Sequence, residues 1–411
     1  MAAMTTLDDA LAHVLAQAQP LGVEYVDLFH ADGRVLAQDC ISALQVPPQD
    51  NSGMDGYAVR VADITAAGVA LPVSQRIPAG HVGTELQPGT AARIFTGAPV
   101  PAGADAVLMQ EDTQVLDDGR VQCNAVPTVG QNIRRAGEVI ALHSTVLAQG
   151  ARLTPAAIGF AASIGMAELP LGRKPRVALF STGDELVIPG TIAPQDMPPG
   201  HIYNSNRYFL RALLQRLGCE VVDGGILPDN RAQTVEAIHK VAQDCDLVLS
   251  SAGVSVGEED HVKPAVEQQG EMNLWMVSMK PGKPFAYGKV WRNGKDASAG
   301  VAHFMGLPGN PVSSFITFLL LVRPFVLRLQ GMQDVAPKTM EATAQFEWNQ
   351  QEKRREFLRV RHGAAGLELF GNQSSGVLTS TVWGDGLIDN PPLTHIQPGD
   401  SVRFIPFAAL M

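Results

Sequence analysis

Three apolar segments of the chain each run into a turn rich in glycine and polar side chains. The clearest is residues 246–263, DLVLSSAGVSVGEEDHVK, in which an apolar run precedes Gly253, Gly257 and a cluster of acids. Residues 181–186 and 307–313 carry similar turns. One such turn is commonly an ordinary loop, but three predict strand ends at one edge of a parallel sheet. Open sheets of this kind bind ligands at that edge.

Strands and helices alternate around these turns, which predicts a doubly wound α/β domain over residues 174–330. The predicted elements are strands at 176–180, 220–224 and 247–250, helices at 206–217, 231–243 and 262–269, a hairpin near 272–290 and a helix after Pro311.

The rest of the chain is predicted to be rich in β structure. Residues 1–173 start with a helix at 5–19, which Thr5 or Thr6 can cap, and contain a β module at about 50–143. A helix with a proline at its first position follows at 154–165. Residues 331–411 return to short alternating segments, which indicates a small β-barrel or sandwich.

Composition excludes several classes of protein. A net charge of −10 over 411 residues argues against a nucleic-acid or membrane surface, so clustered Lys and Arg become informative. The apolar segment 315–329 contains Arg323-Pro324 and is too short to span a bilayer, so we expect a core helix. We expect no signal peptide and a cytoplasmic location, with the four cysteines as reduced structural thiols. The motifs of P-loop proteins, Rossmann dehydrogenases, zinc proteases and serine hydrolases are missing.

Carboxylates follow the predicted strand ends. Glu185, Asp229 and Asp260 each lie at or just beyond one of them. Oxygen ligands of this kind suit Mg²⁺, which usually retains several waters. The alternative is that Glu185 and Asp229 only cap or flank helices.

Two lysines stand in a stiff turn at residues 279–284, MKPGKP. Prolines and glycine constrain this turn, so Lys280 and Lys283 are held in place and suit an oxyanion. A solvated hairpin tip is the alternative. Nearby, Asn310 is predicted to cap the following helix and Pro311 to occupy its first position, where N–H groups favour an anion.

The β module carries three polar turns, at residues 51–57, 96–103 and 130–135. Each reads alone as an ordinary turn. Asp55 could form only an Asx turn, and Arg134-Arg135 only a solvated face.

Taken together, these motifs resemble the molybdopterin molybdenumtransferase family, the MoeA-type proteins related to the gephyrin E domain. The matching segments are N-S-x-M-D-G-Y-A (51–58), T-G-A-P-V-P-x-G-A-D-x-V (96–107), G-Q-N-I-R (130–134), S-T-G-D-E-L (181–186), G-V-S-V-G-E-x-D (253–260), K-P-G-K-P (280–284) and L-P-G-N-P-V-S (307–313). They occur in order over nearly the whole chain.

The resemblance implies a homodimer of multi-domain subunits with a MoaB/Mog-like α/β domain. It implies insertion of molybdate into adenylylated molybdopterin, with release of AMP in a Mg²⁺-dependent step. The molybdopterin adenylyltransferase and cofactor-delivery proteins are possible partners. Catalytic roles fall to Asp55, Glu185, Asp229, Asp260 and Lys280, and metal binding to Glu185, Asp229 and Asp260. Cofactor contacts fall to Thr96, Arg134, Ser181, Thr182, Gly183, Gly253, Ser255, Gly257, Lys283, Pro308, Gly309, Asn310, Ser313 and Ser375.

Three positions depart from the family pattern. Val139 stands where an acid usually follows Gly-Glu, Met276 where a second lysine is common, and Ala252 where a glycine pair begins. The first two remove charges near the expected site, so restoring them as Val139→Asp and Met276→Lys is expected to raise the insertion rate. Two other hypotheses therefore stay open: a non-catalytic molybdopterin-binding scaffold, and an insertion enzyme for another oxyanion such as tungstate.

Overall fold

A computed structural model of the chain describes residues 4–227, 230–253, 261–293, 298, 300–350 and 352–411. These residues form two compact units, and each is described by itself. The larger unit comprises Met1–Gln38, Gln149–Thr154 and Glu168–Met411, and the smaller comprises Asp39–Ala148 and Pro155–Ala167.

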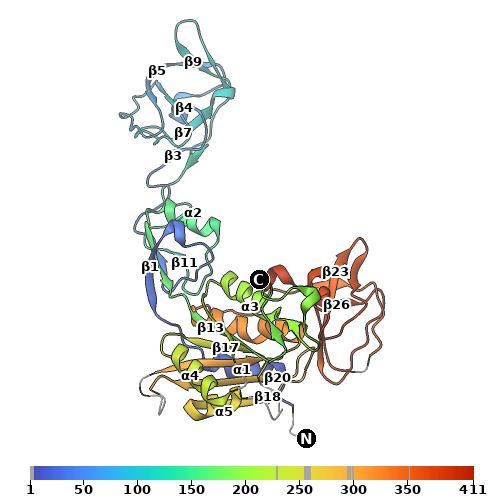
Figure 1. Ribbon diagram of the computed structural model, residues 1–411. Helices are drawn as coiled ribbons and strands as arrows, with labels where there is room; N and C mark the ends of the chain where they lie inside the picture. The colour runs from blue at the N-terminus through green and yellow to red at the C-terminus, as the bar shows by residue number, and fades with distance from the viewer. Residues whose placement is uncertain (1–3, 228–229, 254–260, 294–297, 299, 351) are drawn as a thin grey trace. The chain divides into compact units, whose positions relative to one another are not determined.

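The larger unit is built on a six-stranded sheet with the order β16-β13-β17-β21-β20-β18 (Figure 1). The first four strands are parallel to their neighbours and the last two are antiparallel. Their bounds are β13 Arg176–Thr182, β16 Glu220–Leu227, β17 Leu247–Ser251, β18 Gly270–Met276, β20 Pro284–Trp291 and β21 Val301–Leu307. The predicted doubly wound α/β domain is confirmed.

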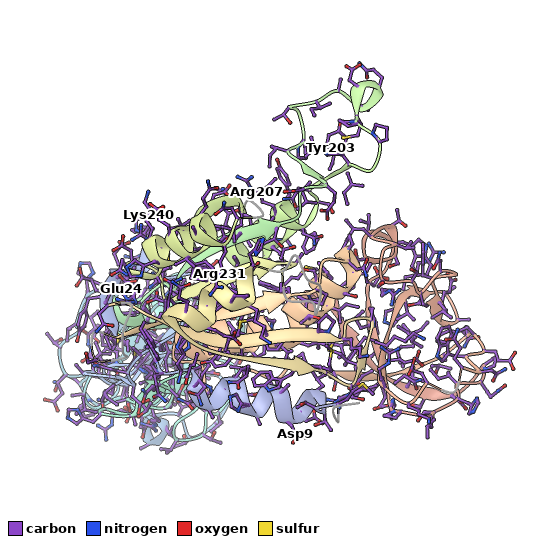
Figure 2. The ribbon with its side chains drawn as sticks, turned by 60° about the horizontal axis from the view of Figure 1, so that its bottom comes forward. Asp9, Glu24, Tyr203, Arg207, Arg231 and Lys240 are labelled. Carbon is purple, nitrogen blue, oxygen red and sulfur yellow. The ribbon has the colours of Figure 1, made fainter. Side chains whose placement is uncertain are left out.

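Helices cover both faces of this sheet because its central strands are apolar on both sides. Val177 and Leu179 of β13 join one buried cluster, while Ala178 and Phe180 join another. The first face is covered by α1 Leu7–Gln17, α3 Asn206–Arg216, α6 Pro311–Thr317 and α7 Arg323–Leu329, and the second by α4 Arg231–Ala242 and α5 Val262–Gln269. Figure 2 shows Arg231 and Lys240 of α4 on one side of the sheet and Asp9 of α1 on the other.

The first helix begins where the sequence indicates. The Thr6 hydroxyl accepts a hydrogen bond from the Asp9 N–H at 3.0 Å, as expected for an N-cap. Leu7, Ala10 and Val14 of α1 lie in the core of the α/β sheet. The helix therefore packs with a domain that the chain reaches only much later.

The expectation that the apolar segment 315–329 is too short to span a bilayer is wrong, because the helical span Pro311–Leu329 starts before that segment and is long and apolar enough to cross a membrane by length and composition. However, 94% of its apolar window is buried inside the protein. The predicted core helix is thus confirmed. A π-helical turn, η6 Phe318–Val322, separates α6 from α7. The turn lies just before Pro324, which has no N–H to donate, so it absorbs the break in the helical ladder.

The C-terminal part of the larger unit forms a second six-stranded sheet, which includes a strand from the α/β domain. Its strands are β19 Met279–Lys280, β22 Met340–Thr343, β23 Arg355–Gly363, β24 Gly366–Leu369, β25 Gly386–Asn390 and β26 Ser401–Pro406. Met279 pairs with Arg355 and Lys280 with Glu356 in a parallel register. Lys280 is thus part of the C-terminal sheet rather than a solvated hairpin tip.

Shorter elements complete the larger unit. They are β1 Val23–Asp27 paired with β12 Glu168–Gly172, β14 Leu186–Val187 paired with β15 Ile202–Tyr203, α8 Thr379–Trp383, and the 3-10 turns η1 Leu28–His30, η4 Pro194–Asp196 and η7 Phe407–Ala409. Tyr203 lies at the base of a loop that projects from the unit (Figure 2).

The smaller unit contains a sheet with the order β7-β4-β6-β5-β9-β8 and is rich in β structure, as predicted. Its elements are β2 Cys40–Ile41, β3 Asn51–Ser52, β4 Gly56–Val59, η2 Val61–Asp63, β5 Val69–Ile77, β6 Ala91–Ile94, β7 Ala106–Met109, η3 Gln110–Asp112, β8 Thr113–Val115, β9 Arg120–Cys123, β10 Ile133–Arg134, β11 Thr145–Leu147 and α2 Pro155–Ser163. A Cβ on Gly56 would lie 1.8 Å from the Leu108 carbonyl oxygen, so close strand packing requires glycine in this motif.

His303 gives the fold a predicted acid sensitivity. Its Nδ1 lies 2.9 Å from the Tyr287 hydroxyl, and burial, aided by the charge of Lys289, lowers its pKa to about 4. The unfolded chain binds this proton at higher pH, so the stability contribution is complete above about pH 6.5 and is lost as the pH falls towards 4. In His303→Gln, the free energy of unfolding is expected to fall by up to about 3 kcal/mol less over this pH range than in the unmodified protein. Urea unfolding between pH 7 and 4.5 measures it, and an equally steep decline in the variant would contradict it.

Candidate functional site

The three predicted turns meet at one edge of the α/β sheet. The Ala252 N–H donates to the Leu307 carbonyl at 3.0 Å, which joins the turns after β17 and β21. The Asn206 amide donates to Ser251 Oγ and to the Gly309 carbonyl, both at 2.8 Å. The start of α3 thus holds two strand ends together, and their expected convergence is confirmed.

A pocket of about 360 Å³ lies at this edge, and we refer to it as the strand-end pocket. It is lined by Thr182, Glu185, Leu186, Ile202, Tyr203, Asn204, Ser205, Asn206, Ser251, Ala252, Gly309, Asn310 and Pro311. Asn204 and Asn206 are 1% and 8% exposed. Asn204 Nδ2 and Asn206 Oδ1 have no hydrogen-bond partner among the described residues, so a ligand with a polar edge could satisfy them. The sequence analysis missed both residues, although they stand just before and at the start of a predicted helix.

Glu185 contributes a carboxylate to the strand-end pocket. A Cβ on Gly183 would lie 2.3 Å from Glu185 Oε2, and Gly183 has a φ of 130°, so glycine is needed beneath this carboxylate. Within the described part of the chain, Glu185 makes no ion pair or side-chain hydrogen bond. Its oxygens are therefore available to a hard cation, as the sequence predicts.

A second pocket, of about 430 Å³, lies next to the first and shares Asn310 with it. We call it the cation pocket, and it is lined by Lys280, Pro281, Gly282, Lys283, Pro284, Pro308, Asn310, Ser313, Arg354, Gln373, Ser374 and Ser375. It unites the K-P-G-K-P turn, the turn before α6 and a loop of the C-terminal sheet. Six residues expected from the sequence line this pocket: Lys280, Lys283, Pro308, Asn310, Ser313 and Ser375.

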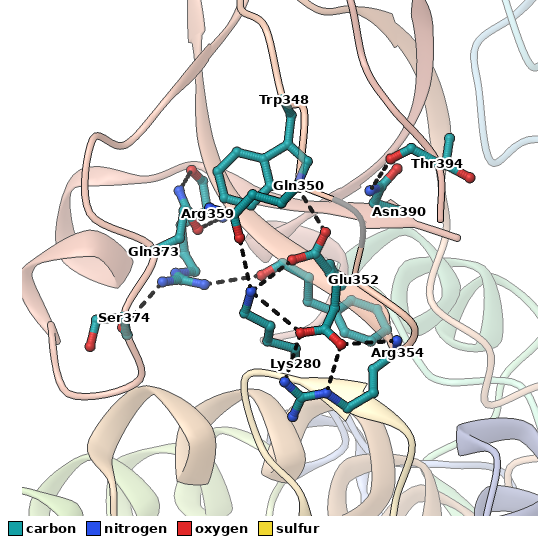
Figure 3. A network of polar contacts seen from close by, with 12 residues as sticks. Lys280, Trp348, Gln350, Glu352, Arg354, Arg359, Gln373, Ser374, Asn390 and Thr394 are labelled. Carbon is teal, nitrogen blue, oxygen red and sulfur yellow. Dashed lines mark hydrogen bonds and ion pairs between the residues drawn. The ribbon is translucent and has the colours of Figure 1, made fainter. Parts of the chain in front are cut away.

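Lys280 is held by carboxylates of the C-terminal sheet (Figure 3). Its ammonium lies 3.1 Å from Glu356 Oε1, 3.1 Å from Gln350 Oε1 and 3.6 Å from Glu352 Oε2. The second Glu356 oxygen accepts a hydrogen bond from the Trp348 indole at 2.8 Å. Lys283, by contrast, has no ion pair or side-chain hydrogen bond within the described residues, so its charge is available to a ligand.

Arg354 is a third cation of this pocket, and the sequence analysis missed it. Its Nε and Nη2 donate to Glu352 at 3.1 and 2.8 Å, while Nη1 has no partner among the described residues. Hydrogen bonds from Arg354 lower the pKa of Glu352 to about 2, so the pair stays ionised at neutral pH. The basic pair Arg354-Arg355 before the predicted strand at 357–361 was the available signal.

Other predicted residues have supporting positions. Asn310 occupies the N-cap position of α6 and Pro311 its first turn, as predicted, but the Asn310 side chain makes no capping hydrogen bond. Asn310 instead lines both pockets. Ser181 is fully buried, and a Cβ on Gly253 would lie 3.0 Å from Thr182 Oγ1. Ala252 adopts a φ of 71°, a left-handed conformation that costs a non-glycine residue about 1 kcal/mol.

In the smaller unit, Asp55 and Thr96 form one local site. The Asp55 carboxylate accepts hydrogen bonds from the Thr96 N–H at 2.7 Å and from the Thr96 hydroxyl at 2.8 Å, and these lower its pKa. Arg134 lies on β10, which pairs with β3 just before Asp55. These three predicted residues therefore lie on neighbouring segments of this unit.

Several predicted residues are not placed in either pocket. Asp229, Ser255, Gly257 and Asp260 lie outside the described residues, so their predicted roles stay predictions. Val139 is 65% exposed in the smaller unit. Met276 ends β18 and lines neither pocket. The rate gain expected from Val139→Asp and Met276→Lys stays a prediction.

Comparisons with known proteins identify the family of this chain. Residues 5–165 match the family described as "MoeA N-terminal region (domain I and II)", residues 178–328 match "Probable molybdopterin binding domain", and residues 341–407 match "MoeA C-terminal region (domain IV)". A molybdopterin molybdenumtransferase of Haemophilus influenzae is 39% identical, over 99% of this chain and 100% of the relative. Molybdopterin molybdenumtransferase 2 of Mycobacterium tuberculosis is 37% identical, over 93% of both chains.

Among solved structures, the molybdopterin biosynthesis moeA protein from Pyrococcus horikoshii superposes with a TM-score of 0.84 at 27% identity, over 98% of this chain and 100% of that chain. The two similar sequences and the three matched regions span nearly the whole chain. This chain therefore belongs to the molybdopterin molybdenumtransferase family, a family of transferases in molybdenum cofactor biosynthesis.

Proposed function

We propose that this protein inserts molybdate into adenylylated molybdopterin and releases AMP in a Mg²⁺-dependent step. The observation that carries the proposal is the pair of adjoining pockets that share Asn310. One is rich in cations and the other offers a carboxylate and unpaired amide groups. An oxyanion and a pterin nucleotide therefore each have a site of matching chemistry, side by side.

In this proposal the cation pocket holds molybdate. Lys283 and the free Nη1 of Arg354 supply charge-assisted hydrogen bonds, and the Ser313 and Ser375 hydroxyls can add neutral ones. The two thiols of the pterin give up their protons and bind molybdenum, one oxide leaves as water, and molybdenum keeps its oxidation state. Water then cleaves the phosphoanhydride, which releases AMP and leaves a phosphate on the pterin.

The strand-end pocket would hold the nucleotide part of the substrate. Asn204 Nδ2 and Asn206 Oδ1 are an unsatisfied donor and an unsatisfied acceptor on residues that line this pocket, which suits the amide-like edge of a pterin or purine ring. Glu185 fits as one oxygen ligand of Mg²⁺, with Asp229 and Asp260 as the proposed further ligands. Bound Mg²⁺ would neutralise phosphate charge beside the cleaved bond.

The decisive experiment follows AMP release from adenylylated molybdopterin by the purified protein. We expect release that requires both molybdate and Mg²⁺ and yields a molybdenum-loaded pterin. Tight pterin binding with no release would favour the non-catalytic scaffold. Faster release with tungstate than with molybdate would favour the other oxyanion.

We further propose that the protein works as a homodimer in the cytoplasm. Val23, Tyr25 and Phe29, on β1 and η1, are 48%, 67% and 97% exposed, an apolar set that a second copy could cover. Asp55, Thr96 and Arg134 would gain a role if they completed the partner's site. Sedimentation is expected to show a dimer at micromolar concentration, and Phe29→Glu with Tyr25→Glu is expected to weaken it. A stable monomer with full activity would overturn this proposal.

A further inference from the structure

The cations of the cation pocket are not equally available. Lys280 is paired with Glu356 and Arg354 with Glu352, so two carboxylates oppose two of the three cations that line the pocket. The Glu356 side chain is only 2% exposed and does not line the pocket. It is therefore a buried negative charge held behind Lys280, which lines the pocket.

A fourth cation, Arg359, lies just outside the pocket and is 1% exposed. Its guanidinium donates to Ser380 Oγ, to the Phe357 carbonyl and to the Ser374 carbonyl, each at 3.2 Å. No carboxylate pairs with it among the residues that the structure describes. Burial alone lowers its pKa, to about 10, so it stays charged at neutral pH.

Arg359 contacts the pocket indirectly, through hydrogen bonds to two residues that line it. Ser374 and Gln373 line the pocket, and the Gln373 side chain accepts a hydrogen bond from the Arg359 N–H at 2.9 Å. Figure 3 shows Arg359, Gln373 and Ser374 on one side of the Lys280 network. Arg359, which has no carboxylate partner among the described residues, is thus buried behind Gln373 and Ser374 of the pocket. Glu356 is buried behind Lys280.

We propose that Arg359 and Glu356 set the oxyanion affinity of the cation pocket through their opposite buried charges, without touching the ligand. Arg359 raises the positive potential in the pocket, while Glu356 lowers it and restrains Lys280. The balance keeps the oxyanion bound weakly enough to be handed to the pterin. This inference rests on the proposed function, because it assumes that the pocket holds an oxyanion.

Charges at this range act strongly because little water separates them from the pocket. A unit charge several ångströms from a dianion, in a partly buried site, changes affinity on the order of tenfold. Glu356→Gln is therefore expected to tighten molybdate binding about tenfold, and Arg359→Met to weaken it about tenfold. The double variant restores the net charge, so its dissociation constant should return close to that of the unmodified protein.

The experiment measures molybdate dissociation constants by calorimetry on the full-length protein. In steady-state AMP release, KM for molybdate is expected to follow these constants, while KM for the pterin nucleotide stays constant. A purely structural role for the two residues predicts the opposite pattern, in which both single variants bind more weakly and the double variant more weakly still. That pattern would overturn the charge balance.

Three controls separate charge from packing. Trp348→Phe removes the indole hydrogen bond to Glu356 but keeps the carboxylate, so it should not tighten binding. Glu368→Gln removes an exposed charge paired with Arg361 in the same sheet and should have no effect. Arg359→Lys keeps the buried charge and should bind molybdate more tightly than Arg359→Met.

The outcomes also separate this inference from the function on which it rests. If the unmodified protein binds no molybdate, the proposed function fails. If it binds molybdate and Glu356→Gln leaves the constant unchanged, only the charge balance fails. Glu356→Gln decides this alone if Arg359→Met does not fold.

Discussion

Arg354→Ala is expected to lower kcat/KM for molybdate roughly 100- to 1,000-fold, the usual cost of removing a fixed donor from an oxyanion site. Two effects act in the same direction. The variant loses the free Nη1 donor of the cation pocket, and it leaves the Glu352 carboxylate without its bidentate partner, so that it repels an anion. Steady-state AMP release at varied molybdate concentration measures the change.

Two variants make this prediction specific to the guanidinium. Arg354→Lys keeps the charge but cannot form the same fork with Glu352 while reaching the pocket, so it should recover only part of the loss. Lys353→Ala removes an exposed neighbouring cation that does not line the pocket and should have little effect. Activity within about threefold of the unmodified protein in Arg354→Ala would place the oxyanion elsewhere.

Glu185→Gln is expected to weaken Mg²⁺ binding and to lower the rate of AMP release, each on the order of 10- to 100-fold. The substitution removes a charged oxygen ligand but keeps the shape of the side chain above Gly183. Binding of Mn²⁺ in the presence of AMP, followed by paramagnetic resonance, reports on the metal separately from turnover.

The neighbouring acid supplies the matched control. Asp184 is exposed and does not line the strand-end pocket, so Asp184→Asn should leave metal binding and rate unchanged. Equal losses in both variants would mean that Glu185 acts through the general charge of the turn. Unchanged Mn²⁺ binding in Glu185→Gln would remove it from the set of metal ligands.

The sequence predicted the strand-end pocket well because its signals are local. Parallel strands place their carboxyl ends at one edge, so a turn such as residues 181–186 can be assigned to that edge from the apolar run before it. The alternation of strand and helix patterns along the chain likewise predicted the α/β sheet. The apolar segment after Pro311 predicted the buried helix that the structure has at Pro311–Leu329. The sequence predicted Asn310 both as the N-cap of α6 and as a ligand contact, but it did not predict that the side chain would make no capping hydrogen bond and would line both pockets.

The cation pocket shows where local signals end. Lys280 and Arg354 meet because β19 pairs with β23, and that pairing joins segments more than seventy residues apart in the sequence. Short strands such as Met279–Lys280 carry almost no periodicity, so only the folded chain selects their partners. The same folding buries Glu356 against Lys280 and buries Arg359 behind the pocket. The sequence alone does not show which cation is paired with a carboxylate.

The sequence by itself determined the α/β domain, the β-rich regions beside it, the family and the residue types of an oxyanion and metal site. Hydrophobic periodicity and glycine-bearing turns act over a few residues, so they can be read without coordinates. Only the tertiary structure decided that Lys280 pairs with Glu356, and that Lys283 and the Nη1 of Arg354 have no partner among the described residues. It also decided that Arg359 is buried without a counter-charge among the described residues. Those outcomes depend on distances between charges in a medium of low polarity, and such distances exist only after distant strands have paired.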